Sequence, residues 1–147
     1  MASAIYWDTS VLLKLYAEEP DSEHYRGILC LRTEQVAISF LHRVELLYAL
    51  AAKEQRGEIA VGQAETLYAS FRKHRGEGRF LEIPWGEDVE NAAHEALTTC
   101  KNHEPPVPLR SLDGFHLGAI RAAGIQTIIT TDLRFRAAAE CLGLDLC

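Results

Sequence analysis

Four acidic residues stand where strands are expected to end or helices to begin. They are Asp8, Glu45, Asp113 and Asp132. Asp8 follows an apolar run over residues 5–7, and Asp132 follows a β-branched run over residues 127–131, both typical of short buried strands. Because ligands of open α/β sheets bind beyond the carboxyl ends of the strands, both carboxylates are expected at one rim. Asp113 lies in the first turn of a helix predicted to begin at Ser111. It is expected at the same rim, because a helix between parallel strands runs antiparallel to them.

Glu45 is expected to join them from a helix predicted from residue 40 to about residue 55. Helical spacing places Glu45 on a stripe with Leu41, Val44 and Tyr48. The stripe is otherwise apolar, and a buried glutamate is costly unless it has a partner. Helical side chains lean toward the helix N-terminus, which directs Glu45 toward the rim. The alternative is that the helix turns a different face to the core, in which case Glu45 lies on its exposed surface.

Carboxylates gathered at one rim repel each other unless a cation lies between them. Hard oxygen ligands favour Mg²⁺ or Mn²⁺ over zinc, and the six scattered histidines and four separated cysteines form no zinc-type spacing. His116, three residues after Asp113 on the same helix face, is expected to pack or to support one of the acids. With one or two divalent ions, the chemistry indicated is phosphodiester hydrolysis. The sequence therefore predicts that the four carboxylates are close enough to share a metal site.

Each acid also has a simpler interpretation. Asp8 or Thr9 can cap the first helix, because aspartate and threonine are favoured at that position. Asp113 can act as an acid in the first turn that stabilises the helix dipole. Asp132 can cap the last helix. The spacing alone leaves these alternatives open.

The elements that must position these residues alternate along the chain. Strands are predicted near residues 5–7, 36–38, 80–85, 126–131 and 145–147. Helices are predicted through residue 16, over 22–32, over 40–55, through 64–71, over 89–100, from 111 to Gly124, and over 133–142, with a basic loop over residues 72–79. Alternating strands and helices predict an α/β fold, a three-layer α/β/α arrangement in which about seven helices cover a short, mostly parallel sheet. The length fits a single domain over residues 1–147.

Composition narrows the class of protein. No apolar run approaches the roughly 20 residues of a membrane span, and no secretory signal pattern is evident. The cysteines form no pattern of pairs, which is typical of a reduced, cytoplasmic protein. The net charge of −6 weakens a nucleic-acid interaction without excluding one, since a local basic patch can act against the global field.

The whole chain resembles the PIN domain family, and above all the VapC-type ribonuclease toxins of bacterial and archaeal toxin–antitoxin pairs. The resemblance rests on four ordered segments: Asp8-Thr9-Ser10, Glu45 within the long third helix, residues 112–117, and Thr130-Thr131-Asp132. It implies an endoribonuclease that depends on Mg²⁺ or Mn²⁺ and acts on RNA through the four acids. It also implies a homodimer and inhibition by a cognate, VapB-like antitoxin whose tail covers the acidic site. Thr9 and Ser10 match positions whose hydroxyls orient the first acid, and Thr130 matches one that does so for Asp132.

Basic residues near the acids in sequence are the candidates for RNA contact. They are Lys14, Arg110, Arg134 and Arg136, with Arg43 a weaker candidate. Two rival functions stay open beside the nuclease. An aspartyl-phosphate phosphatase needs an acid two residues after Asp8, where this chain has Ser10. The non-enzymatic alternative is a catalytically inactive PIN-like module that binds RNA or protein.

Overall fold

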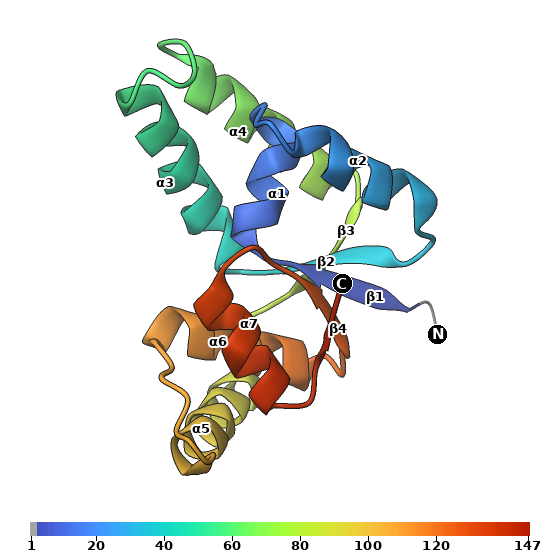
Figure 1. Cartoon of the computed structure of the whole chain (residues 1–147). Helices are drawn as coiled ribbons and strands as arrows, with labels where there is room; N and C mark the ends of the chain where they lie inside the picture. The colour runs from blue at the N-terminus through green and yellow to red at the C-terminus, as the bar shows by residue number, and fades with distance from the viewer. Residues whose placement is uncertain (1–2) are drawn as a thin grey trace.

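A parallel sheet forms the centre of the molecule (Figure 1). The structure is a computed structural model that describes residues 3–147. Its strands are β1 (Ala4–Trp7), β2 (Gln35–Ser39), β3 (Phe80–Ile83), β4 (Thr127–Ile129) and β5 (Asp145–Leu146). They lie in the order β3-β2-β1-β4-β5, and each neighbouring pair is parallel. The carboxyl ends of β1 and β4 are therefore adjacent, with Trp7 paired to Ile129.

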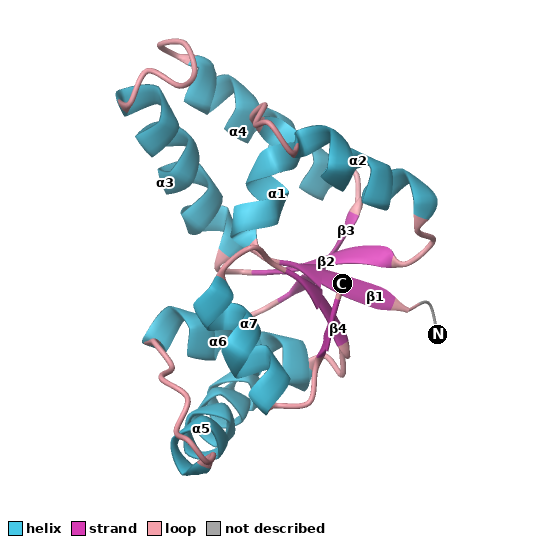
Figure 2. Ribbon diagram, viewed as in Figure 1, coloured by secondary structure: helices cyan, strands magenta, loops and turns pink. Residues whose placement is uncertain are grey.

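Helices cover the sheet in two layers (Figure 2). They are α1 (Thr9–Tyr16), α2 (Ser22–Leu31), α3 (His42–Gln55), α4 (Gln63–Gly76), α5 (Glu87–Asn102), α6 (Ser111–Ala122) and α7 (Leu133–Cys141). The first four lie on one face of the sheet and the last three on the other (Figure 1). This arrangement confirms the predicted α/β class and its three layers. None of the helices in the described residues combines the length and apolar character that a membrane span requires.

Alternate residues of the central strands point into two separate cores. Tyr6 and Ile128 belong to the core beneath α5, α6 and α7. Ile5, Trp7 and Ile129 belong to the core beneath α1, α3 and α4. This is the period of two that a strand buried on both faces must have. Tyr6 is thus a polar side chain that faces the α6 side from the middle of the sheet.

The predicted phase of α3 is wrong. Its buried residues are His42, Leu46, Leu50 and Lys53. Val44 and Tyr48, which were expected to be buried, are 59% and 71% exposed. The buried glutamate was inferred from a stripe whose Val44 and Tyr48 in fact face outward, so the argument from burial fails even though Glu45 does line the pocket.

The predicted basic loop over residues 72–79 is also wrong in part. α4 continues to Gly76, so Lys73, His74 and Arg75 lie on its last turn rather than in a loop. The chain leaves the helix through Gly78, whose φ of 72° is the left-handed conformation that glycine adopts readily. Gly76 does not adopt a positive φ and belongs to the helix, where a glycine lowers helix stability by a modest amount.

Close packing of α5 against α6 depends on Gly118. A Cβ added there would lie 2.5 Å from the Val89 carbonyl oxygen and 2.9 Å from the Ala93 Cβ. The two backbones therefore approach more closely than a larger residue allows. This contact fixes the position of α6, which carries Asp113.

We expect Gly118→Ala to lower the free energy of unfolding by about 1–3 kcal/mol, because the new methyl group overpacks the contact. The matched control is Gly27→Ala, inside α2, where an added Cβ meets nothing within 4 Å. That substitution should stabilise the protein by up to about 1 kcal/mol through helix propensity. Urea unfolding of both variants makes the comparison. Equal effects of the two substitutions would contradict the close-packing interpretation.

Candidate active site

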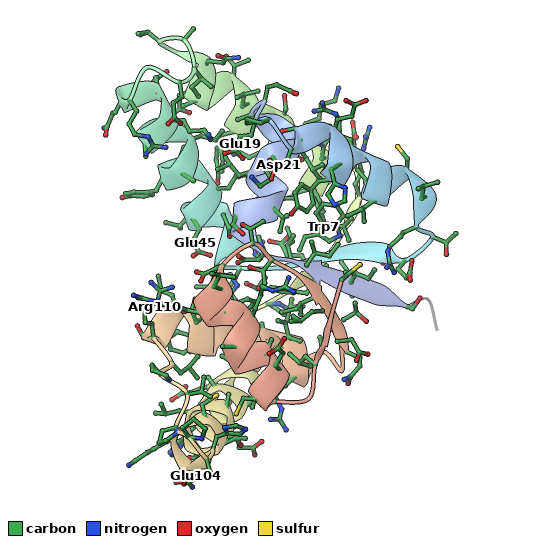
Figure 3. All side chains as sticks on the ribbon, in the orientation of Figure 1. Trp7, Glu19, Asp21, Glu45, Glu104 and Arg110 are labelled. Atoms are coloured by element: carbon green, nitrogen blue, oxygen red, sulfur yellow. The ribbon has the colours of Figure 1, made fainter. Side chains whose placement is uncertain are left out.

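The four acids predicted from sequence line one open pocket of about 460 Å³. Asp8 follows β1, Asp132 precedes α7, and Glu45 and Asp113 lie in the first turns of α3 and α6. The remaining lining residues are Thr9, Ser10, Arg110, Ser111, Leu112 and His116. Figure 3 shows Glu45, from α3, and Arg110, from the segment before α6, on the same side of the molecule. The shared-rim geometry expected from the parallel sheet is therefore present.

Asp8 does not act as a helix cap. It occupies the residue before α1, but its side chain makes no capping hydrogen bond. Its Oδ2 instead accepts hydrogen bonds from Ser10 Oγ and Thr130 Oγ1, both at 2.8 Å. These two hydroxyls compensate the charge and fix the carboxylate at the mouth of the pocket. The simpler interpretation of Asp8 as a cap is wrong.

The hydroxyl roles implied by the family resemblance hold only for Ser10. Thr9 Oγ1 donates to Glu45 Oε1 at 3.1 Å rather than to Asp8. Thr130 donates to Asp8, while its Oγ1 accepts the backbone N–H of Asp132 at 3.1 Å. Thr130 therefore links the two strand-end acids instead of orienting the Asp132 carboxylate.

Glu45 is held by a buried histidine that the sequence placed only as a packing or supporting residue. His116 is 2% exposed, and its Nε2 lies 2.5 Å from Glu45 Oε1. Burial by itself raises the pKa of Glu45, but the hydrogen bond and electrostatic interaction with His116, with smaller contributions from His42 and from the Thr9 hydrogen bond, outweigh burial and leave that pKa below its usual value. The carboxylate is therefore charged at neutral pH.

A polar network continues from His116 into the core. The Tyr6 hydroxyl lies 2.5 Å from His116 Nδ1 and 3.0 Å from Ser39 Oγ. Burial raises the pKa of Tyr6 well above its usual value, so the hydroxyl keeps its proton. The network extends from the middle of β1 and the end of β2 to Glu45, and it holds the Glu45 side chain from the side of the core.

His42 is a structural residue that sequence analysis missed. Its Nδ1 accepts the backbone N–H of Ser39 at 3.0 Å, and its Nε2 donates to the Trp7 carbonyl at 2.7 Å. A backbone N–H can only donate and a carbonyl can only accept, so these partners fix the neutral Nε2–H tautomer. His42 thereby ties the start of α3 to the end of β1, one residue before Asp8. Only its position on the buried face of α3 could have marked it, and that face was predicted wrongly.

Asp113 and Asp132 share the guanidinium of Arg110. Arg110 Nε donates to Asp113 Oδ2 at 3.0 Å, and Nη2 donates to Asp132 Oδ2 at 3.2 Å. The other oxygen of Asp132 caps α7, accepting from the N–H groups of Arg134 at 2.9 Å and Phe135 at 3.3 Å. Asp132 is thus both a cap and a pocket acid, so the two interpretations of this residue are compatible.

That the four carboxylates are close enough to share a metal site stays a prediction, because they line one pocket without surrounding a common ion position. Across residues 3–147, no three acidic, histidine or cysteine side chains converge as a ready-made metal site. The physical reason is that each acid already has partners, with a cation between Asp113 and Asp132. The donor set nevertheless suits a hard divalent ion, because it consists of carboxylate oxygens in an open pocket.

The candidate RNA contacts differ in their surroundings. Lys14 is 12% exposed in its side chain and pairs with Glu19 and Asp21, outside the pocket lining. Arg110 and Arg134 both line a neighbouring cavity of about 530 Å³ beside Asp113.

Two further candidates are also engaged by other groups. Arg136 donates to the Thr130 carbonyl at 3.3 Å. Arg43 pairs with Glu82. Arg110 and Arg134 are therefore the cations best placed to reach a ligand at the acidic pocket.

The family model for the PIN domain matches residues 5–140, and the chain belongs to this family. It is 31% identical to ribonuclease VapC46 of Mycobacterium tuberculosis over 144 residues, which is 97% of this chain and 95% of that protein. Its fold is similar to that in DNA-bound VapBC from Salmonella typhimurium, with a TM-score of 0.70, 18% identity, and coverage of 100% of this chain and 98% of that one. It is also similar to VapC20 of M. tuberculosis, a sarcin-ricin loop cleaving toxin, with a TM-score of 0.64, 21% identity and coverage of 91% and 94%.

The neutral, buried state of His42 predicts a pH dependence of stability. Burial lowers the pKa of His42 to about 4, whereas an unfolded histidine titrates near pH 6.5. The unfolded chain then binds the proton more tightly. The contribution of His42 to the free energy of unfolding is therefore complete above about pH 6.5 and declines below it, by up to about 1.4 kcal/mol per pH unit.

Urea unfolding at several pH values between 4 and 7 measures this effect. The parent should lose more stability on acidification than His42→Gln, which has no titrating group at this position. His24→Gln, at an exposed histidine of α2, serves as the control and should follow the parent. Identical acid sensitivity of the parent and His42→Gln would show that another group is responsible.

Proposed function

We propose that this chain is a VapC-like toxin, a divalent-metal-dependent endoribonuclease that hydrolyses RNA phosphodiester bonds. The observation that carries the proposal is the gathering of Asp8, Glu45, Asp113 and Asp132 around one open pocket at the carboxyl rim of the sheet. The PIN family membership and the identity to a VapC ribonuclease support it. An aspartyl-phosphate phosphatase is not favoured, because the residue two after Asp8 is Ser10, which donates a hydrogen bond to Asp8.

The acids would hold Mg²⁺ or Mn²⁺ through oxygens that the protein leaves unpaired. Among the described residues, no hydrogen bond reaches Asp8 Oδ1, Glu45 Oε2 or Asp113 Oδ1, while the opposite oxygen of each is held in place. Asp132 would contribute Oδ2 once Arg110 moves away from it. A bound divalent ion would supply an activated water and neutralise charge that develops on the phosphate.

The protein's own part in the reaction is to keep these ligands charged and oriented. Ser10 and Thr130 hold Asp8, and His116 and Thr9 hold Glu45. Arranged donors of this kind fix ligand geometry in metal sites. Because the chain has a net charge of −6, RNA must be attracted locally, and we assign that role to Arg110 and Arg134 at the edge of the pocket.

We further propose a cognate, VapB-like antitoxin partner and a homodimer. VapBC complexes are among the structures with a similar fold, including one from Rickettsia felis bound to a promoter DNA fragment. Val44 and Tyr48 form an exposed apolar pair one turn apart on α3, the helix that carries Glu45, which favours a protein interface there. A cytoplasmic location fits the four free cysteines of the described chain.

We expect Asp8→Asn to abolish metal-dependent RNA cleavage while leaving the fold intact. Asparagine keeps the shape of the side chain but removes the charge that a metal requires. The loss should be at least the roughly 10–100-fold that supporting residues of metal sites cause. The assay is cleavage of a mixed RNA pool with chelator, Mg²⁺ or Mn²⁺, followed by sequencing of the new ends.

The matched control is Glu140→Gln, which removes a charge from the exposed face of α7, outside the pocket lining. It should cleave as the parent does. Thermal melts provide a second measurement, because metal that binds only the folded state should raise the melting temperature of the parent and not that of Asp8→Asn. RNA binding by the parent without cleavage in any metal would favour the inactive binding module. Cleavage that persists in Asp8→Asn would remove the proposed site.

A further inference from the structure

Arg110 occupies a junction at the acidic rim. It lines the acidic pocket of about 460 Å³, the cavity of about 530 Å³ beside α7, and a third cavity of about 480 Å³ between α5 and α6. Its side chain is 56% exposed, and its guanidinium contacts Asp113 and Asp132 together. One exposed cation thus contacts both acids and contributes to the lining of all three cavities.

We propose that Arg110 exchanges partners during the working cycle of the protein. In the metal-free protein it is the internal counter-ion of Asp113 and Asp132. When a divalent ion binds these acids, the guanidinium is released and binds a phosphate of the RNA. This inference rests on the proposed metal-dependent function, and it makes metal binding and RNA binding cooperative through one side chain.

The first step of the exchange follows from shared atoms. Arg110 engages Oδ2 of both acids, at 3.0 Å and 3.2 Å. A divalent ion that binds Asp132 through Oδ2 must displace the guanidinium from that acid, and its charge beside Asp113 weakens the remaining pair. Without either cation, two carboxylates that contact the same guanidinium position repel each other. Arg110 therefore keeps the acids together in the metal-free state and competes with metal for them.

The chemistry of arginine suits both partners. Its planar fork presents two nitrogens in different directions, so one side chain reaches two carboxylates at once, which a lysine ammonium does less well. The same fork binds phosphate through paired, charge-assisted hydrogen bonds. Exposed ion pairs of this type are individually weak, so a divalent ion can displace them at small cost.

The second step follows from position. Arg110 is the residue common to the linings of the three cavities, so RNA that enters the acidic pocket from either neighbouring cavity comes close to its side chain. While the guanidinium is paired with two acids, its charge is compensated. After metal binding, the charge is available to a phosphate at the same place. Because coupling between two ligands is reciprocal, RNA must then tighten metal binding by the same factor that metal tightens RNA binding.

Direct metal titration tests the competition. Mn²⁺ binding to the parent, Arg110→Gln, Arg110→Lys and Arg134→Gln is measured by calorimetry. We expect Arg110→Gln to bind Mn²⁺ about three- to tenfold more tightly than the parent, as the loss of two weak competing pairs implies. Arg110→Lys should also bind more tightly than the parent although its charge is unchanged, because lysine bridges the acids less well. Arg134→Gln removes the same charge from the same rim without breaking the bridge, and it should change Mn²⁺ affinity less than twofold.

The coupling is tested with a 2′-O-methyl phosphorothioate oligonucleotide of mixed sequence, which keeps the backbone charge and resists hydrolysis. Mn²⁺ should tighten its binding by the same factor in the parent and in Arg134→Gln, although Arg134→Gln binds the oligonucleotide more weakly at every Mn²⁺ concentration, and by a several-fold smaller factor in Arg110→Gln. Equal Mn²⁺ affinity in Arg110→Gln and Arg134→Gln, or equal coupling in all variants, would overturn the partner exchange while leaving the metal site intact. Absence of Mn²⁺ binding to the parent would instead overturn the proposed function and the exchange with it.

Discussion

Repulsion among the four carboxylates at one rim is the constraint that the side chains around them must offset. The parallel sheet places the ends of β1 and β4 side by side, and the first turns of α3 and α6 open onto the same pocket. Like charges that share one pocket repel each other, and the cost grows as their separation and the local dielectric fall. Hydroxyls hold Asp8, His116 and Thr9 hold Glu45, and Arg110 is shared by Asp113 and Asp132, so the pocket is compensated before any metal enters.

These donors come from different depths of the molecule. Ser10 and Arg110 are near the surface, whereas His116 and Tyr6 are almost fully buried and reach Glu45 from the core. A histidine or tyrosine in such a core is tolerated because its polar atoms all have partners, and no buried side-chain nitrogen or oxygen in the described residues lacks one. The core therefore does more than stabilise the sheet, because its polar centre fixes one of the pocket acids.

The sequence predicted the architecture and the four acids, because both follow from local patterns. Each of these patterns is visible within a single segment of sequence. Asp8 and Asp132 each follow a strand, and Asp113 follows the start of a helix. Glu45 was selected for a wrong reason, since the outward-facing Val44 was taken for the buried face of α3. The family resemblance pointed to Glu45 independently of that periodicity, and the structure places Glu45 in the lining of the pocket.

The partners of the acids could not be predicted, because they depend on side chains far apart in the chain. Thr130 reaches Asp8 across 122 positions, and His116 reaches Glu45 across 71. Arg110 could be named from sequence as a nearby cation. Its bridge between Asp113 and Asp132 could not, because it forms only when the segment before α6 lies beside the starts of both α6 and α7.

The central claim is that this compensated acidic rim is a divalent metal site. Anomalous diffraction from crystals of the protein soaked in Mn²⁺ tests it most directly. The account predicts ordered Mn²⁺ in the pocket, about 2.1 Å from carboxylate oxygens of Asp8 and of Asp113 or Asp132, as hard divalent ions require. Mn²⁺ bound only elsewhere on the protein, or no ordered ion in the pocket at saturating concentration, would contradict it.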